Sequence, residues 1–238
     1  SARFHAGYIE TEISGELGLG PVASPFGTGS IDPIAIEDSL GIDQASPSWL
    51  ARAELDAGPV RLTTSAFQYD ESGSGQLSGS FGGISGGTAV DSEIEFFAAK
   101  AALTFDILDF DVFRISPGVG ADILDLQARV TEATTGDEEE VDELFPIPMV
   151  FVQAELDLGP VGVVVDGGGM DAGVFDIEEI DGTFYDVEAL LIGEPTEGLE
   201  LFAGYRWISI DAQGVVDSQD YAADLTLQGW FVGGGVKF

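Results

Sequence analysis

Alternation of apolar and polar residues at every second position is the feature that most limits what this chain can fold into. A β-strand turns successive side chains to opposite faces, so such alternation gives one apolar and one polar face. In Ile9–Leu19, for example, Ile9 and Ile13 are apolar while Glu10 and Glu12 are acidic. No long stretch shows the three- and four-residue spacing of an amphipathic helix. The sequence therefore predicts an all-β fold.

Ten stretches follow this alternation and are expected to be strands. They are Ile9–Leu19, Trp49–Asp56, Val60–Tyr69, Ser92–Asp106, Val112–Leu126, Val150–Leu158, Val161–Asp171, Thr183–Gly193, Leu199–Asp211 and Tyr221–Phe238. In the fourth stretch the polar residues change from odd positions, Glu93 and Glu95, to even positions, Lys100 and Thr104. This change of phase predicts a β-bulge near Phe96.

Short and long connections alternate between these stretches. The short ones centre on Gly58-Pro59, Asp109-Phe110, Gly159-Pro160 and Pro195–Gly198, where glycine and proline favour turns. The long ones are Gly20–Ser48, Asp70–Asp91, Gln127–Pro146, Ala172–Gly182 and Gly214–Asp220. This order predicts an up-and-down antiparallel meander with every tight turn at one end. The whole chain, 1–238, is expected to form one such domain.

The C-terminal strand shows a resemblance to a known class of protein. Trp230, Val232 and Val236 alternate toward a final Phe238, and this ending resembles the terminal strand of bacterial outer-membrane β-barrel proteins. With the connection pattern, the resemblance implies a transmembrane barrel of about ten strands with short periplasmic turns and long extracellular loops. It also implies residence in the bacterial outer membrane, contact with its lipid and lipopolysaccharide, and insertion by the barrel-assembly machinery that reads this strand.

Aromatic residues are expected at two levels, one at each membrane interface. The level toward the long loops would contain Trp49, Tyr69, Phe96, Phe151, Tyr185, Trp207 and Tyr221. The level toward the tight turns would contain Phe4, Tyr8, Phe105, Phe113 and Phe238. Ordinary core aromatics of a soluble β-protein are the alternative interpretation.

The charge balance excludes several functions. The chain has 8 Lys and Arg against 43 Asp and Glu, a net charge of −35. Binding to nucleic acid or to an anionic membrane surface needs a basic footprint, which is missing. Cysteine is absent, so disulfides and thiolate metal sites are excluded. The acid excess favours cations as partners, or a saline habitat that screens the repulsion.

The basic residues on predicted strands indicate where the polar faces point. Charge facing lipid is costly, so these side chains are expected to face the lumen, where arginine can bridge several carboxylates. The predicted lumen network comprises Arg52, Arg61, Lys100, Arg114, Arg206, Glu10, Glu12, Glu54, Asp106, Asp122, Glu155 and Glu200. It would partly plug a narrow lumen, because barrels of about this size are filled by side chains. Scattered pairs in an aqueous pore are the alternative.

Sites for catalysis or for a resident cofactor are not expected. The single histidine, His5, lies near the N-terminus, away from the predicted loops where a His-based catalyst would be needed. Paired carboxylates are numerous enough to arise by chance among 43 acids. The loop residues Asp137, Glu138, Glu139 and Glu140 could collect divalent cations, but they lack the glycine and alternating ligands of a calcium loop. A solvated loop is the alternative interpretation for that run.

Three functions agree with these features. The first is a non-enzymatic structural or interaction barrel with an acidic, partly plugged lumen and with envelope proteins as partners. The second is a small passive channel that favours cations or small polar solutes. The third is an acidic soluble β-sandwich of a halophile. This alternative does not explain the terminal Phe238 or the alternation of short and long connections.

Overall fold

The chain forms one antiparallel sheet of twelve strands that closes on itself. The computed structural model describes residues 1–21, 31–175, 181–216 and 219–238. The long strands are β1 (Ala2–Leu19), β3 (Ser46–Ala57), β4 (Val60–Gln76), β5 (Ala89–Phe105), β7 (Phe113–Glu132), β8 (Glu138–Asp157), β9 (Val161–Asp171), β10 (Asp181–Thr196), β11 (Leu199–Val216) and β12 (Gln219–Lys237). The short strands β2 (Ile34–Ala35) and β6 (Leu108–Phe110) pair at the sides of β1 and β7.

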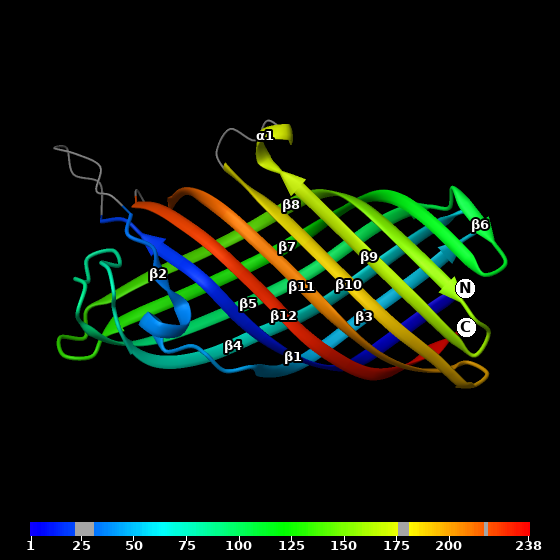
Figure 1. The fold of residues 1–238 in the computed structure, drawn as a ribbon, viewed down its shortest axis with the longest axis horizontal. Coiled ribbons are helices and arrows are strands. Elements are labelled where there is room, and N and C mark those ends of the chain that lie inside the picture. Colours follow the sequence, from blue (N-terminus) through cyan, green and yellow to red (C-terminus); the bar gives the residue numbers. More distant parts are fainter. Residues whose placement is uncertain (22–30, 176–180, 217–218) are drawn as a thin grey trace.

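Pairing between the first and last strands closes the barrel. β12 pairs antiparallel with β1 from Arg3 opposite Lys237 to Leu19 opposite Tyr221. Each other long strand pairs with the long strands next to it in the chain, so the ring holds ten long strands in up-and-down order. Figure 1 shows these strands crossing the barrel axis obliquely on the near and far walls. The expected all-β up-and-down barrel is therefore confirmed.

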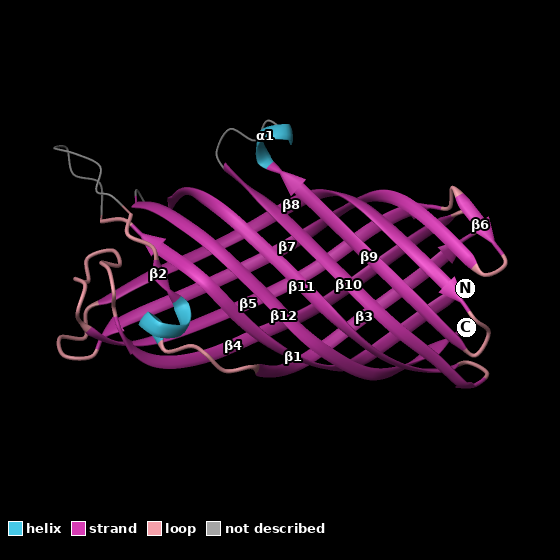
Figure 2. Ribbon diagram, in the orientation of Figure 1, coloured by secondary structure: helices cyan, strands magenta, loops and turns pink. Residues whose placement is uncertain are grey.

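The two ends of the barrel differ, as Figures 1 and 2 show. Both termini and the short connections at Gly58-Pro59 and Gly159-Pro160 lie at one end, here called the tight-turn end. The opposite, long-loop end includes the short helix η1 (Ile36–Leu40), and the four-residue helix α1 (Ala172–Phe175) follows β9. Across the described ranges, neither helix has the length and apolar character needed to cross a membrane.

Several strands extend much further toward the long-loop end than predicted. β4 and β5 stay paired as far as Gln76 opposite Ala89, and β7 and β8 as far as Thr131 opposite Glu138. The expected loop Gln127–Pro146 is thus largely strand, and both ends of the expected loop Asp70–Asp91 are strand. Acidic residues and glycine are depleted in ordinary strands, which is why these segments resembled loops in the sequence. The expected bulge near Phe96 is also wrong, because β5 keeps one register along both neighbours.

Long strands instead change the face that carries their apolar residues. On β1, Phe4 and Tyr8 are exposed on the outer face, whereas Ile9 and Ile13, a little further along, are buried on the inner face. The same change occurs on β5, where Leu103 lies outside and Phe96 inside. The half toward the tight turns is therefore apolar outside, and the other half is apolar inside. A barrel that stands partly in lipid and partly in water needs this inversion.

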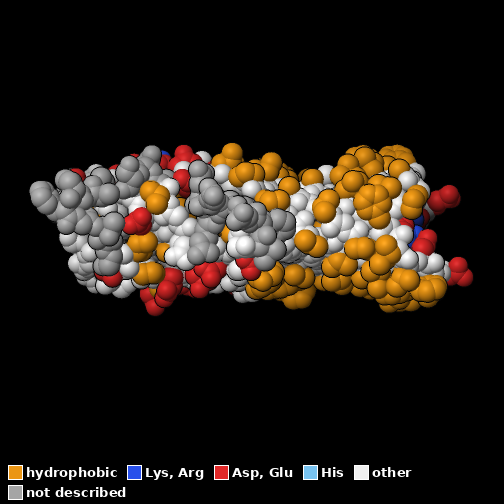
Figure 3. Space-filling view, turned by 90° about the horizontal axis from the view of Figure 1, so that it is seen from above, with side chains coloured by type: hydrophobic (Ala, Val, Ile, Leu, Met, Phe, Trp, Pro, Cys, Tyr) orange, Lys and Arg blue, Asp and Glu red, His pale blue; other side chains and the backbone are white. Residues whose placement is uncertain are grey.

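The outer apolar belt ends at a ring of aromatic side chains. Tyr8 lies opposite Trp49 across β1 and β3, and Phe97, Tyr185, Trp207 and Trp230 are further aromatics on the outer face. At the tight-turn end, the exposed aromatics are Phe4, Phe105, Phe110, Phe113 and Phe238. Figure 3 shows hydrophobic side chains gathered over this half and acidic ones over the other.

Part of the predicted assignment of aromatics is wrong. Tyr69, Phe96, Phe151 and Tyr221 are buried inside the barrel, where they belong to its apolar core. Tyr8 lies at the upper aromatic level beside Trp49 and not at the tight-turn end. These errors share one cause: an aromatic residue above the belt faces inward because the strand faces have exchanged their roles.

The inversion predicts that an arginine introduced at two positions on the outer face of β1 has different effects on stability. Ala6→Arg places a charge within the apolar belt, and we expect it to destabilise the barrel by about 2–4 kcal/mol. Glu12→Arg lies on the same face beyond Tyr8, where it meets water, and should leave the free energy of unfolding nearly unchanged. Urea unfolding of the barrel refolded in phospholipid vesicles measures both. Equal losses would contradict a membrane boundary between Tyr8 and Glu10.

Candidate functional site: the polar network inside the barrel

Polar side chains fill the inner face of the barrel in the half toward the tight turns. They occupy alternate positions of the strands, and the positions between them face outward as the apolar belt. Arg52, Lys100 and Arg206 are buried at the centre, whereas Arg61 lies closer to the tight turns. Arg114, whose side chain is 32% exposed, lies at the rim. The structure thus places every basic residue of the predicted network inside or at the mouth.

Six side chains form a central cluster: Arg52, Lys100, Asp166, Asp186, Glu188 and Arg206. Lys100 Nζ lies 3.0 Å from Asp166 Oδ1 and 2.9 Å from Asp186 Oδ2. Arg206 donates two hydrogen bonds to the two oxygens of Asp186, at 3.0 and 2.9 Å. Arg52 donates to Asp166 and to Glu188. Such forked, multiply shared contacts offset the high cost of removing charges from water.

A second cluster lies between this centre and the tight-turn end. Arg61 Nε lies 2.6 Å from Asp56 Oδ1, and Arg61 Nη1 lies 3.0 Å from Glu155 Oε2. Arg3 lies 3.0 Å from Glu54 and 3.5 Å from Glu200. We call this the lower cluster; its members are Arg3, His5, Glu54, Asp56, Arg61, Asp106, Arg114, Gln153, Glu155 and Glu200.

The remaining members of the lower cluster form contacts around Arg61 and Glu200 or near Arg114. His5 Nε2 lies 2.7 Å from Glu200 Oε2, so the single histidine is a buried partner of a carboxylate. Asp106 accepts a hydrogen bond of 2.6 Å from Ser116 and lies 3.6 Å from Arg114. Arg61 also donates to Gln153, at 2.7 Å. All these groups are held by neighbours on other strands.

Asp122 is set apart from the other predicted members. Its side chain is fully buried opposite Lys100 across β5 and β7. In the part of the chain that the structure describes, neither of its carboxylate oxygens has a hydrogen-bond partner. It therefore stands at the edge of the central cluster without a direct bond to it.

Aromatic rings separate the central cluster from the apolar half of the interior. The guanidinium carbon of Arg206 lies 4.8 Å from the centre of the Phe67 ring, and Lys100 Nζ lies 5.5 Å from that of Phe151. Cations over ring faces are stabilised by the ring quadrupole. Beyond these rings the inner face is apolar, with buried Leu124, Ile208 and Leu227. The interior thus has a charged lower half and an apolar upper half.

Two predicted network residues, Glu10 and Glu12, are wrongly assigned. Both are exposed on the outer face of β1, and the apolar Ile9 and Ile13 are the residues that face inward. Their segment stands beyond the aromatic level, where the outer face meets water and carboxylates are well solvated. The assumption that apolar residues face lipid along the entire strand caused the error.

Several network residues were missed in the sequence. Arg3 lies ahead of the first predicted strand, and Asp166 stands beside the glycine run Gly167–Gly169 that obscures alternation in β9. Asp186 and Glu188 alternate with Val187 and therefore carried the necessary signal. Among 43 acids, however, nothing singled them out as partners of Arg206 and Arg52.

The predicted cation-binding run is engaged in other contacts. Glu138 and Glu140 form ion pairs with Arg129, at 3.4 and 2.9 Å. Glu139 Oε1 accepts a hydrogen bond of 2.8 Å from the Gly83 backbone, and Asp137 accepts one of 3.0 Å from Thr135. These contacts direct the four carboxylates to three partners in different places, so they do not converge on one point.

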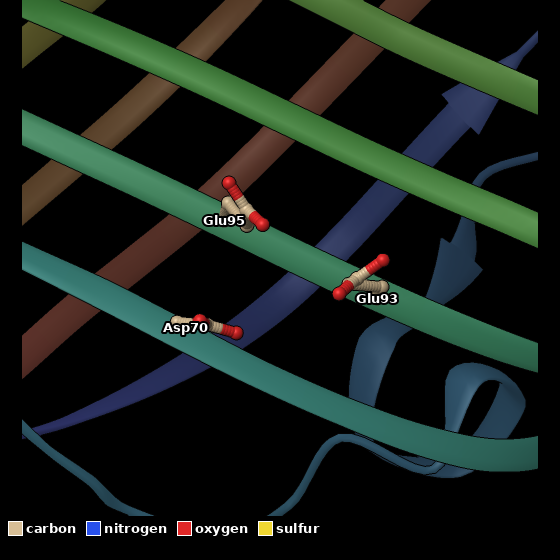
Figure 4. A group of neighbouring side chains, drawn as sticks. All are labelled: Asp70, Glu93 and Glu95. Atoms are coloured by element: carbon tan, nitrogen blue, oxygen red, sulfur yellow. The ribbon is translucent and has the colours of Figure 1, made fainter.

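A separate group of carboxylates stands on β4 and β5. Ligand atoms of Asp70, Glu93 and Glu95 lie within 4.8 Å of one another, and Figure 4 shows the three side chains on adjacent strands. Asp70 and Glu95 face each other across the strand pair. Exposed acidic groups of this kind are common on a chain with so many acids, so the group is a surface feature.

The predicted insertion residues all stand on the outer face of β12. Trp230, Val232, Val236 and Phe238 are exposed there, and Phe238 contacts Phe4 of β1 with ring centres 6.4 Å apart. This strand closes the barrel against β1. Recognition of this strand by the barrel-assembly machinery stays a prediction.

Comparison with known proteins gives structural matches alone. No family model matches the chain, and no curated protein matches its sequence. The outer membrane protease OmpT from Escherichia coli matches with a TM-score of 0.59 and 10% identity, over 100% of this chain and 96% of that one. The translocator domain of autotransporter NalP from Neisseria meningitidis (TM-score 0.46, 11% identity, 100% and 88% covered) and Ail of Yersinia pestis (0.44, 11%, 100% and 97%) also match.

The OmpT match shows a shared fold at an identity too low to show more. That fold is the antiparallel barrel of bacterial outer-membrane proteins. The exposed apolar belt between two aromatic levels is suited to a lipid bilayer around the barrel. Fold and belt together indicate a protein of the bacterial outer membrane.

The central cluster predicts that loss of one cation is severe. Lys100→Met leaves Asp166 and Asp186 short of a partner in a buried site, and we expect a loss of about 3–5 kcal/mol in the free energy of unfolding. Arg129→Met removes exposed ion pairs and should change stability little, because water screens them. Urea unfolding in vesicles compares the two variants. Similar behaviour of both would show that the cluster is not a buried network.

Proposed function

We propose that this protein is a non-enzymatic structural or interaction barrel of the outer membrane whose lumen is plugged by its own side chains. The observation that carries the proposal is the set of ion pairs and hydrogen bonds that join distant walls of the barrel. Arg52 on β3 bonds Asp166 on β9 and Glu188 on β10. Arg206 on β11 bonds Ser65 on β4, at 3.3 Å. Such contacts leave side chains in the path that a solute would take.

The apolar upper half of the interior supports the same proposal. An ion that passed the charged clusters would next meet buried Phe67, Phe96 and Leu124, where it would lose its hydration. Hydrophobic constrictions in pores stop conduction by excluding water. A polar solute therefore encounters two barriers of different chemistry in series.

The position of the single histidine supports a non-enzymatic role. His5 is buried in the lower cluster against Glu200, away from the surface of the long-loop half. OmpT is named as a protease, but one fold hosts many functions, and function must be argued from the site. The charged clusters use their carboxylates in ion pairs, which is a structural role.

The outer surface of the long-loop half is the natural contact region for partners. It carries exposed acids beyond the aromatic level, among them Glu10, Glu12, Asp142 and Asp224. With the tight turns in the periplasm, this surface would face the cell exterior. Divalent cations could bridge it to lipopolysaccharide phosphates, or envelope proteins with basic surfaces could bind it.

Conductance in planar lipid bilayers tests the plugged barrel against the small channel. We expect no steady current after insertion, at low or high salt, because paired side chains fill the charged half and the apolar half excludes hydrated ions. Insertion itself is verified by the shift of the folded band on a gel between unheated and boiled samples. A steady cation-selective current from verified insertions would overturn the plug and select the channel.

A further inference from the structure

The apolar half of the interior contains a cavity of about 300 Å³. It lies between the upper parts of the strands, beyond the charged clusters. Residues from eight strands line it, including Phe96, Leu124, Ile147, Phe184, Ile210 and Leu225. All six of these residues are buried.

The lining is nearly free of polar side chains. Thr183, Asp211 and Tyr221 are the polar members, and Thr183 lies opposite Asp211 at the outer side of the wall. A cavity lined by aliphatic and aromatic side chains is poorly suited to water; one of about 150 Å³ stays dry and binds benzene. A cavity twice that size suits an apolar molecule of roughly twelve non-hydrogen atoms.

The barrel wall is interrupted beside this cavity. β9 pairs with β8 along Val150–Asp157, and β9 ends at Asp171. Across the ranges that the structure describes, β8 residues 138–149 pair with β7 on one side and with no strand on the other. Pro146 and Pro148 stand in this unpaired edge, and proline suits an edge because it has no N–H to donate. Pro146 and Ile147 of the edge line the cavity.

A similar interruption above β3 is closed. β3 begins at Ser46, and the wall between β1 and β4 beyond it is filled by the segment Ile34–Gly41. Ile34, Ile36 and Leu40 of this segment are fully buried, so they complete the core. Its backbone packs so closely on β4 that a side chain at Gly73 would strike Gly41. Within the residues that the structure describes, one interruption is therefore sealed by the segment Ile34–Gly41, and the other stands beside a cavity.

The position of the second interruption matters for access. β9 ends at Asp171, which pairs with Thr183, and Tyr185 of the aromatic level is the next outer position on β10. The interruption thus begins directly above the membrane boundary. Molecules dissolved in the outer leaflet meet water at this height, so an apolar molecule could reach the cavity without crossing the charged surface beyond.

We propose that this cavity is a binding site for a neutral apolar molecule of roughly twelve non-hydrogen atoms, entered from the side between β8 and β10. Acidic residues beside the cavity set the charge preference. Asp211 lines the cavity and pairs with the exposed Asp224, so an anionic head group would be repelled there. The site lies on the other side of the Phe67 and Phe151 rings from the charged clusters, so it does not depend on their ion pairs.

Methyl NMR of the barrel in lipid nanodiscs tests the site with 1-decanol as the probe. We expect saturable shifts of cavity methyls, such as those of Leu124, Ile147 and Ile210. The methyls of Leu103 and Leu201, exposed on the outer belt, report simple partition into lipid and should shift without saturation. Decanoate, the anionic counterpart, should bind at least about tenfold more weakly, because repulsion beside the cavity then adds about 1.4 kcal/mol or more.

Two variants of β12 provide the matched comparison. Ala223→Trp fills the cavity from its lining and should abolish the saturable shifts, whereas Ala222→Trp, on the opposite face of the strand, should preserve them. Parallel, non-saturating shifts of cavity and belt methyls in the unaltered protein would overturn the site, whether or not either variant folds. Equal affinity for 1-decanol and decanoate would overturn the preference for neutral ligands. Neither result depends on conductance, so failure of this site and failure of the plug are distinguishable.

Discussion

One strand must satisfy two different surroundings along its length, and this constraint organises the whole barrel. Near the tight turns the outer face meets lipid, and beyond the aromatic level it meets water. Side chains alternate strictly between the two faces. Where the outer face is apolar the inner face is therefore polar, and where the outer face is polar the inner face is apolar. Ala99, Leu103 and Phe105 of β5 are outside in the belt, while Lys100 and Thr104 lie inside. Further along the same strand, Glu95 is outside and Phe96 inside.

The inner face of the belt region holds charge, and the way it does so limits what the lumen can become. An unpaired charge beneath a lipid-facing wall is expensive, so each cation in the central cluster bonds carboxylates on other strands. Lys100 bridges Asp166 and Asp186, and Arg206 holds Asp186 with a planar fork. These bonds also fix the distance between opposite walls. Bonds of this kind between opposite walls make the barrel more rigid, and the side chains that form them occupy the lumen.

Much of the fold can be predicted from alternation and turn residues alone. The ring of ten long strands, its order and its short connections follow from segments such as Val60–Tyr69 and from turns such as Gly58-Pro59. The change of phase in β5 between Glu95 and Lys100 was also visible, but it has two physical explanations. A bulge shifts the backbone, whereas an inversion shifts the surroundings and leaves the register intact. Pairing data along both neighbours decide for the inversion, and a single sequence contains no such data.

The partners inside the lumen are beyond sequence reasoning for a geometric reason. Arg52 bonds Asp166 and Glu188, which are 114 and 136 residues away along the chain. Which residues face one another across a barrel depends on strand tilt and stagger, quantities set by closure of the complete ring. Alternation gives the inward direction of Arg52, but it does not give the height at which Arg52 meets the far wall. The apolar cavity beside β8 depends on the closed ring in the same way. β9 ends at Asp171, and the effect of this early end is visible only when the positions of β8 and β10 are known.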